Sequence, residues 1–235
     1  MTIPILMYHS ISYDSDKLSV SPKIFFKQLK YLNNNGYKSI SFKELNKDNL
    51  KKKFIITFDD GYEDIYKNAL PILKKFNFSA TCFFVSNLIG KYNSWDENKK
   101  NFFKKKLMNI EQIGKWITEG MDVGSHTKNH YNLTRINSLE KQSEILDPIN
   151  FFKKNFCINV NSFSYPYGKY DLESLNIVKE NYDFAVNTQR SRYYFNKFNY
   201  HEIPRIPVDK SCGFLKFYLK LKTIYEDIKF KKKIL

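Results

Sequence analysis

The sequence predicts a single α/β domain built around parallel strands. Short apolar runs alternate along the chain with segments whose apolar residues recur at helical spacing. Strands that alternate with helices pair in parallel, because each helix crosses the sheet and returns the chain to the same edge. No internal repeat or low-complexity linker divides the 235 residues, so we expect one shared core.

Seven short runs are the expected strands, and most of them are rich in β-branched and aromatic residues. In chain order they cover residues 3–8, 54–58, 80–85, 121–125, 160–166, 184–188 and 202–208. In parallel α/β folds, ligands bind at the carboxyl ends of the strands. The residues that follow each run are therefore the first candidates for a functional site.

The segments between these runs have helix signals. Ser21 and Pro22 occupy the favoured first positions of a helix that Gly36 ends. Pro71 falls inside the next helical segment, residues 66–76, and predicts a kink or an interruption there. Further helices are expected over residues 110–120, 137–156 and 172–180.

Two segments depart from this alternation. Residues 91–106, rich in lysine and aromatic residues, form a long excursion between two expected strands. Near the end of the chain, apolar residues recur at steps of three and four and predict one amphipathic helix over about 214–230. We expect this helix to pack against the domain, with contact to an anionic membrane surface as the alternative.

Composition excludes several classes of protein. Hydrophobic residues make up 42% and aromatic residues 17%, which excludes a disordered chain. No apolar stretch approaches the roughly 18 residues of a membrane span. The formal charge is +15, but only four of the 39 basic residues are arginines, the residue best suited to phosphate and base recognition. A nucleic-acid partner is therefore not expected.

Cysteine usage and the N-terminus predict a cytoplasmic protein. Cys82, Cys157 and Cys212 are too few and too widely spaced for a disulfide framework or a Cys-x-x-Cys metal site. Free thiols fit a reducing compartment. The first residues, MTIPILMYHS, lack the basic segment and the long apolar run of a secretory leader. The positive charge leaves association with an anionic membrane as an addition to this expectation.

Titratable residues gather at the expected strand ends. Asp59 and Asp60 follow the run 54–58, His126 follows 121–125, and His9 follows 3–8. His130 lies four residues after His126, a spacing that places both imidazoles on one side of a helical turn. Two imidazoles and one carboxylate suit Zn²⁺ or a similar divalent ion.

Two adjacent aspartates at a strand end can divide two tasks of metal-assisted hydrolysis. One carboxylate holds the ion, and the other accepts a proton from water. Neighbouring side chains of a strand point to opposite faces. The turn expected at Gly61 ends this alternation, so that Asp59 and Asp60 can both enter one site.

Three motifs, in this order, resemble those of the polysaccharide deacetylases, the NodB-homology superfamily or carbohydrate esterase family four. They are T-F-D-D-G at 57–61, G-S-H-T-x-x-H at 124–130 and S-Y-P-Y-G at 164–168. The segment EQIGKWITEGMDVGSH also resembles the family, and the resemblance covers nearly the whole chain. It implies an irregular (β/α)7-type barrel that occupies residues 1–235 as one deacetylase domain.

The resemblance also implies the roles of the motif residues. Asp59 becomes the general base, and the ligands of a divalent metal become Asp60, His126 and His130. Zn²⁺ is the expected ion, with Co²⁺, Ni²⁺ and Fe²⁺ as alternatives. Pro166 and Tyr167 would line the substrate groove, and the backbone N–H of Tyr167 would hold the oxyanion.

Two departures point to a subgroup of this family. Ser164 stands where the third motif usually begins with arginine, and the usual late leucine-histidine motif is missing. Both departures resemble the permuted poly-N-acetylglucosamine deacetylases, whose acid histidine lies on the first strand. M-Y-H-S-I at 7–11 matches that pattern, which makes His9 the expected general acid. His201 precedes a strand and is expected to be structural.

Arg205 and Trp95 are expected near the site for separate reasons. Arg205, in the last expected strand, is the candidate to replace the missing motif arginine by pairing with Asp59. Trp95 lies in the excursion among lysines, where its ring could stack on a pyranose; an ordinary aromatic residue of a surface loop is the alternative.

The implied reaction is hydrolysis of N-acetyl groups on amino sugars of the N-acetylglucosamine type. The expected partner is a bacterial surface polysaccharide or its lipid-linked or nucleotide-linked precursor. Hydrolysis of an O-acetyl ester or a formamide in the same site is an alternative, as is a glycan-binding relative without activity. The complete set of Asp59, Asp60, His126, His130 and His9 argues against the inactive relative.

Overall fold

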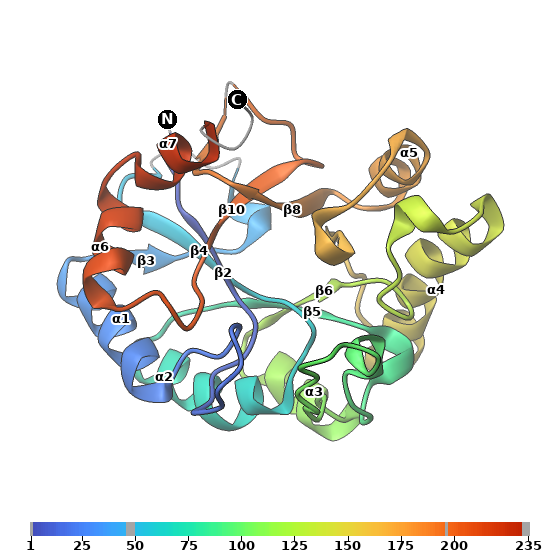
Figure 1. The fold of residues 1–235 in the computed structure, drawn as a ribbon, viewed down its shortest axis with the longest axis horizontal. Helices are drawn as coiled ribbons and strands as arrows, with labels where there is room; N and C mark the ends of the chain where they lie inside the picture. Colours follow the sequence, from blue (N-terminus) through green and yellow to red (C-terminus); the bar gives the residue numbers. More distant parts are fainter. Residues whose placement is uncertain (1, 46–49, 196, 232–235) are drawn as a thin grey trace.

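Seven parallel strands close into a barrel in the computed structural model, which describes residues 2–45, 50–195 and 197–231 (Figure 1). Each strand pairs with its neighbours in parallel, and β2 closes the barrel by pairing with both β4 and β10. All seven runs expected from the sequence are strands of this barrel. They are β2 (Ile5–Tyr8), β4 (Lys53–Phe58), β5 (Thr81–Phe84), β6 (Asp122–Ser125), β7 (Ser162–Ser164), β8 (Phe184–Arg190) and β10 (Ile203–Pro207).

Three short strands add to this barrel. β3 (Lys38–Ser39) pairs in parallel with the first residues of β4. β1 (Thr2–Ile3) and β9 (Tyr193–Tyr194) form a separate antiparallel pair.

The barrel strands are buried on both faces, as parallel strands under helices are expected to be. Along β4, Phe54, Ile56 and Phe58 pack in the large apolar cluster that includes the helices. Ile55 faces the other way and joins a second cluster with Phe83 of β5. That second cluster fills one part of the barrel interior with apolar side chains. Arg205 of β10 and Thr57 of β4 are buried polar residues, and they meet toward the carboxyl ends of the strands.

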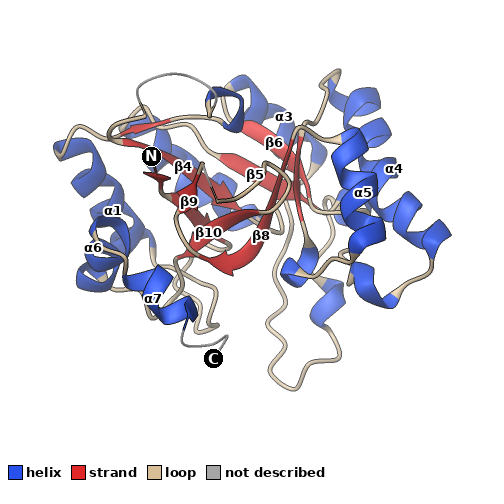
Figure 2. Cartoon of the chain, turned by 90° about the horizontal axis from the view of Figure 1, so that it is seen from above, coloured by secondary structure: helices blue, strands red, loops and turns tan. Residues whose placement is uncertain are grey.

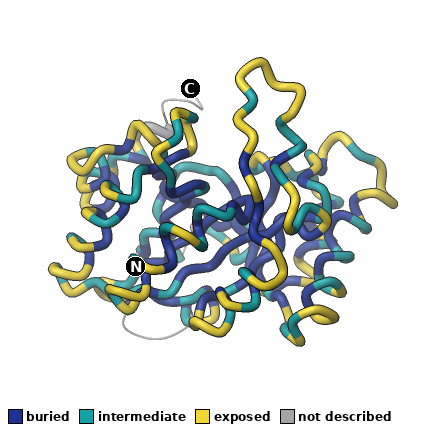
Figure 3. Tube along the Cα trace, turned by 90° about the horizontal axis from the view of Figure 1, so that it is seen from below, coloured by how far each residue is buried: buried dark blue, intermediate teal, exposed yellow. Residues whose placement is uncertain are grey.

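Helices surround the strands on the outside, as Figure 2 shows, and in Figure 3 the buried residues follow the central strands. Ser21 caps the first helix by accepting a hydrogen bond from the Ile24 N–H. Asn109 and Asn137 begin two others with capping boxes. The helices are α1 (Pro22–Asn34), α2 (Leu70–Lys75), α3 (Ile110–Thr118), α4 (Ser138–Phe156), α5 (Leu172–Asn181), α6 (Phe214–Lys222) and α7 (Tyr225–Lys231).

The expected interruption at Pro71 is present. Residues Ile65–Ala69 form a π-helical turn, and α2 starts at Leu70 with Pro71 in its first turn. Proline is tolerated there because the N–H groups of a first turn have no partner within the helix.

The expectation of one C-terminal helix over 214–230 is wrong, because the chain breaks into α6 and α7. Thr223 is extended, with φ −123° and ψ 174°, and its side chain accepts a hydrogen bond from the Tyr225 N–H. Arg192 donates to the carbonyls of Leu221 and Thr223, and it thereby satisfies the end of α6. α6 packs on α1, with Tyr31 against Phe214. Residues 232–235 of the basic end lie outside the described residues.

Two expectations about the whole chain can be compared with the structure. All three cysteines are free thiols, as their spacing predicted. None of the described helices combines the length and the apolar character needed to cross a membrane.

Candidate active site

The predicted site residues converge at the carboxyl ends of the barrel strands. Asp59 and Asp60 directly follow β4, His126 follows β6, and His9 follows β2. Pro166–Gly168 forms a short 3₁₀ turn two residues after β7. Because the strands are parallel, residues far apart in sequence reach the same end of the barrel.

The turn after β4 separates the two aspartates. The Asp59 N–H still donates to the Tyr8 carbonyl of β2, at 3.0 Å. Asp60 and Gly61 then both adopt left-handed conformations, with φ of 73° and 74°. The expected turn at Gly61 therefore begins one residue earlier, at Asp60. A Cβ atom on Gly61 would lie 2.5 Å from the Phe84 ring, so this position requires glycine.

Asp60, His126 and His130 form a compact set of metal-ligand atoms. Asp60 Oδ1 lies 3.4 Å from Nε2 of His126 and 3.4 Å from Nε2 of His130. All three ligand atoms lie within 4.8 Å of one another, and all three residues are buried. Ligands bound about 2.1 Å from a tetrahedral ion lie about 3.4 Å apart, so these residues fit a divalent metal such as Zn²⁺.

The expectation that His126 and His130 share a helical turn is wrong. They lie in a loop in which Thr127 and His130 have φ of 65° and 63°. The His130 N–H donates to Thr127 Oγ1 at 2.9 Å. Glu144 of α4 accepts hydrogen bonds from the backbone and side-chain N–H groups of Asn129, at 2.8 and 2.5 Å. The loop is thus held by its own hydrogen bonds and by α4, and it brings the two rings to the same place.

Different contacts orient the two imidazoles. His126 Nδ1 lies 2.7 Å from the Ser164 carbonyl, and a proton on Nδ1 leaves Nε2 free to face Asp60. Nδ1 of His130 has no hydrogen-bond partner in the described part of the chain. Its ring is held by packing instead, stacked on Trp95 with 4.4 Å between centroids and edge-on to Tyr167 at 4.7 Å.

Arg205 and Asp59 form a buried bidentate ion pair near the carboxyl ends of the strands. The two guanidinium NH groups lie 2.7 Å from Oδ1 and 2.7 Å from Oδ2 of Asp59. Arg205 also donates to Thr57 Oγ1 and Ser164 Oγ, both at 3.1 Å. The pairing expected from the sequence is present, and Ser164 lies beside it.

This ion pair and the nearby histidines set the charge of the two aspartates. Burial raises the pKa of Asp59, but Arg205 more than compensates and leaves the pKa below its ordinary range. Burial also opposes ionisation of Asp60, yet contacts with His126 and His130 hold its pKa well below the ordinary range. Both carboxylates are therefore ionised at neutral pH.

His9 also lies close to Asp59, with Nε2 at 3.9 Å from Oδ2. Its side chain keeps 18% exposure and so remains open to a ligand. The next residue, Ser10, donates to Asp64 Oδ2 and accepts from Lys105 Nζ, each at 2.7 Å. These bonds fix the segment that carries His9.

Some neighbours of the site were not anticipated. Thr57 has a sequence signal, because alternation along β4 places it on the same face as Asp59. Tyr62, whose hydroxyl contacts Asp60, and Lys105, a buried residue of the excursion, have no sequence signal of this kind. His201 lies before β10 with Nε2 at 2.8 Å from the Tyr182 carbonyl, a structural contact as expected.

Comparison with known proteins identifies the family. The sequence profile of the polysaccharide deacetylases matches residues 46–182, more than half of the chain. The chain belongs to the polysaccharide deacetylase family. The motifs at 57–61, 124–130 and 164–168 lie within the matched residues, and the barrel is the fold of this family.

Two curated sequences are similar to this chain. YxkH of Bacillus subtilis (strain 168) is 34% identical over 194 residues, which cover 80% of this chain and 64% of YxkH. The chain thus spans less than two thirds of that relative. The poly-beta-1,6-N-acetyl-D-glucosamine N-deacetylase of Staphylococcus aureus (strain MRSA252) is 32% identical over 221 residues, or 86% of this chain and 71% of the relative.

Two solved structures have the same barrel fold as this chain. The Streptococcus pyogenes deacetylase PplD in complex with acetate superposes with a TM-score of 0.82 and 26% identity, over 94% of this chain and 99% of PplD. IcaB from Ammonifex degensii superposes with a TM-score of 0.76 and 19% identity, over 94% and 97% of the two chains. The second likeness bears on the fold alone.

Proposed function

We propose that this polysaccharide deacetylase removes N-acetyl groups from amino sugars of the N-acetylglucosamine type, in a bacterial surface polysaccharide or its precursor. The arrangement of Asp59 beside the set of Asp60, His126 and His130 carries the proposal. The name of the Staphylococcus aureus relative, a poly-N-acetylglucosamine N-deacetylase, supports the choice of sugar.

Asp60, His126 and His130 would hold a divalent cation, for which Zn²⁺ is our first choice. Such a cation supplies Lewis-acid activation of water and of the acyl carbonyl. Two imidazoles and one carboxylate leave room for further ligands around the ion. Mg²⁺ and Ca²⁺ prefer oxygen ligands, so this set with two imidazole nitrogens suits them less well.

Asp59 acts as the general base in this proposal. Its carboxylate is ionised at neutral pH, and it lies next to the candidate metal ligand Asp60, so it can accept a proton from water at the reacting carbon. Arg205 is a positioning residue, since both of its terminal nitrogens bind Asp59. It fixes the orientation of the carboxylate and keeps it charged.

His9 acts as the general acid in this proposal. An amine leaves poorly as an anion, so the sugar nitrogen must gain a proton as the carbon–nitrogen bond breaks. The partly exposed imidazole, 3.9 Å from Asp59, is placed to donate that proton. The backbone N–H of Tyr167 stabilises the oxyanion in our proposal.

Pro166 and Tyr167 line the proposed sugar site. Tyr167 is 42% exposed, and its ring can contact a pyranose. Trp95 was a candidate for the same task, but one face of its ring covers His130. We propose that Trp95 both shields this imidazole from water and bounds the sugar site with its free edge.

Release of acetate tests the function. Metal-loaded protein is incubated with N-acetylglucosamine oligomers, with O-acetylated glycans and with N-acetylated sugar nucleotides, and acetate is measured by mass spectrometry. We expect acetate from the N-acetylated oligomers. Acetate from O-acetylated glycans alone would identify an esterase, and no acetate from any substrate would contradict the proposal.

Asp59→Asn tests the assignment of the base. We expect a loss of at least about a hundredfold in kcat, because general-base catalysis contributes roughly a hundred- to ten-thousandfold. Asp183→Asn is the matched control, since Asp183 is exposed just before β8, at the other end of the barrel. Near-normal turnover of the Asp59 variant would disprove its role.

A further inference from the structure

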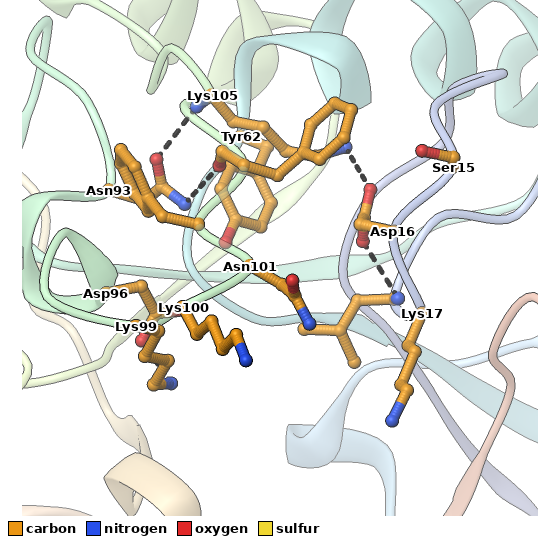
Figure 4. Close-up of a pocket in the computed structure, with 13 residues that line it drawn as sticks. Ser15, Asp16, Lys17, Tyr62, Asn93, Asp96, Lys99, Lys100, Asn101 and Lys105 are labelled. Atoms are coloured by element: carbon orange, nitrogen blue, oxygen red, sulfur yellow. Dashed lines mark hydrogen bonds and ion pairs between the residues drawn. The ribbon is translucent and has the colours of Figure 1, made fainter.

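A cavity of about 800 Å³ opens beside the candidate active site, between residues 15–18 and the excursion 91–106 (Figure 4). Tyr62 forms part of its wall, and its hydroxyl contacts Asp60. On another side, the Lys99 amine lies 5.6 Å from the centre of the Tyr167 ring. A glycan whose acetamide group reaches Asp59 and Asp60 would therefore place a neighbouring sugar in or next to this cavity.

The one ammonium group at the base of the cavity is already paired with carboxylates. Lys105, with 7% of its side chain exposed, lies 2.8 Å from Asp14 and 3.0 Å from Asp16. Asp64 follows at 3.7 Å, and the hydroxyls of Ser10 and Ser19 lie within 2.8 Å. With three carboxylates around one ammonium group, the base carries net negative charge, so any attraction for an anion must come from other residues of the cavity.

The mouth of the cavity carries positive charge that is not neutralised. Lys99 pairs with Asp96. Lys17 and Lys100 also line the cavity, and neither has a carboxylate at ion-pairing distance among the residues that the structure describes. In Figure 4 the side-chain nitrogens of Lys17, Lys100 and Asn101 lie along the same side of the cavity.

Resting on the function proposed above, we propose that this cavity binds a sugar that carries a phosphate or a carboxylate group, next to the sugar that is deacetylated. The ammonium groups of Lys17 and Lys100 would pair with the anion. Either a phosphate or a carboxylate can pair with them, because an ammonium group acts as a point charge. The substrate would then be an anionic glycan. Phe103, 42% exposed in the lining, offers an apolar surface to the sugar ring.

Charge also distinguishes this substrate from a uniform amino-sugar polymer. Each deacetylation of such a polymer leaves an ammonium group on the chain. Lys17 and Lys100 would repel an ammonium group in the cavity, so a deacetylated neighbour binds worse than an acetylated one. A phosphate or carboxylate is attracted by the same two side chains.

A charge series of short oligosaccharides tests the proposal. Each contains one N-acetylglucosamine, and its neighbour is neutral N-acetylglucosamine, cationic glucosamine, a phosphorylated sugar or a uronic acid. At low salt we expect kcat/KM to be about tenfold higher for an anionic neighbour than for the neutral one, and lower for glucosamine. The rates of the phosphorylated and the uronic acid oligosaccharides show which of the two anions the cavity prefers. The preference should shrink as salt is added.

The variant Lys17→Gln/Lys100→Gln links the preference to the cavity. We expect the anionic-to-neutral ratio of kcat/KM to fall from about tenfold to within about twofold. Lys153→Gln/Lys154→Gln on the exposed side of α4 makes the same change in net charge and should keep the preference. Equal rates across the series, a preference for glucosamine, or a preference that survives in the double variant would overturn the inference.

Binding measurements keep this inference separate from the proposed function. Calorimetric titration of the four oligosaccharides needs no turnover, and the anionic compounds should bind more tightly than the neutral one. If no oligosaccharide releases acetate but the anionic ones bind more tightly through Lys17 and Lys100, the activity is wrong and the charge preference is right. Acetate release without any preference in binding or rate contradicts the inference alone.

Discussion

Arg205 and Asp59 illustrate how one residue sets the chemistry of another at the residue scale. Both side chains are buried, and a buried carboxylate without a partner has a raised pKa and becomes neutral. The bidentate contact with Arg205 reverses this effect and keeps Asp59 ionised. Thr57, Ser164 and the Asn187 carbonyl accept the remaining hydrogen bonds of the guanidinium group.

Replacement of Arg205 by Met should damage both stability and activity. Removal of one partner of a buried ion pair costs about 3–5 kcal/mol of unfolding free energy, since the other charge is left unpaired. The pKa of Asp59 should rise, so the acid limb of the pH–rate profile should move to higher pH. Urea unfolding and the pH dependence of kcat/KM measure these effects. An unchanged acid limb would show that Asp59 does not depend on Arg205.

A swap of the two positions provides the matched control. Arg205→Ser together with Ser164→Arg returns an arginine to the place where the family motif has it, 3.1 Å from the present guanidinium group. We expect this pair to recover part of the stability and activity that Arg205→Ser alone loses. No recovery would mean that the pairing depends on the strand that supplies the arginine.

At the scale of elements, the turn after β4 directs both aspartates into the site. It needs two successive left-handed residues, and the second lies against the Phe84 ring. Lys105 is a second residue through which one segment positions another near the site. It ties the end of the excursion 91–106 to the segment that follows His9.

Gly61→Ala should destabilise the protein and impair metal binding. A Cβ atom at this position meets Phe84 at 2.5 Å, and φ of 74° is strained for alanine, so we expect a loss of about 1–3 kcal/mol or more. Gly114→Ala in α3 is the control, because no atom lies within 4 Å of its Cβ position. That change should stabilise the helix by about 0.5–1 kcal/mol. Equal thermal stabilities of the two variants would contradict this account.

At the scale of the whole molecule, the candidate metal site joins β4 to the loop after β6, and α4 and β7 support it. Burial lowers the pKa of His126, but its contact with Asp60 and the charge of Asp59 outweigh burial and leave the pKa raised. Burial lowers the pKa of His130, which therefore stays neutral and available to a metal. The two imidazoles differ in how strongly protons compete for them.

Stabilisation by Zn²⁺ should therefore increase with pH. Protonated His126 stabilises the metal-free fold fully below pH 6.5, its ordinary pKa, and this contribution is lost as pH rises through the raised pKa. A metal needs the neutral ring, so protons compete with it at low pH. The increase in Tm on adding Zn²⁺ should be larger at pH 8 than at pH 6. Asp60→Ala should show little increase at either pH, and an increase that is larger at pH 6 would refute the prediction.

The sequence by itself determined the seven strands, most of the helices and the residues of the candidate site, because apolar runs, caps and short motifs are local patterns. The tertiary structure decided how those residues meet. Arg205 reaches Asp59 across 146 positions only because the barrel closes between β10 and β2. The loop from His126 to His130 depends on α4 and not on a helical turn, and Trp95 reaches His130 because the excursion folds back over the barrel. Contacts of this kind depend on how distant segments pack, which spacing along the chain does not encode.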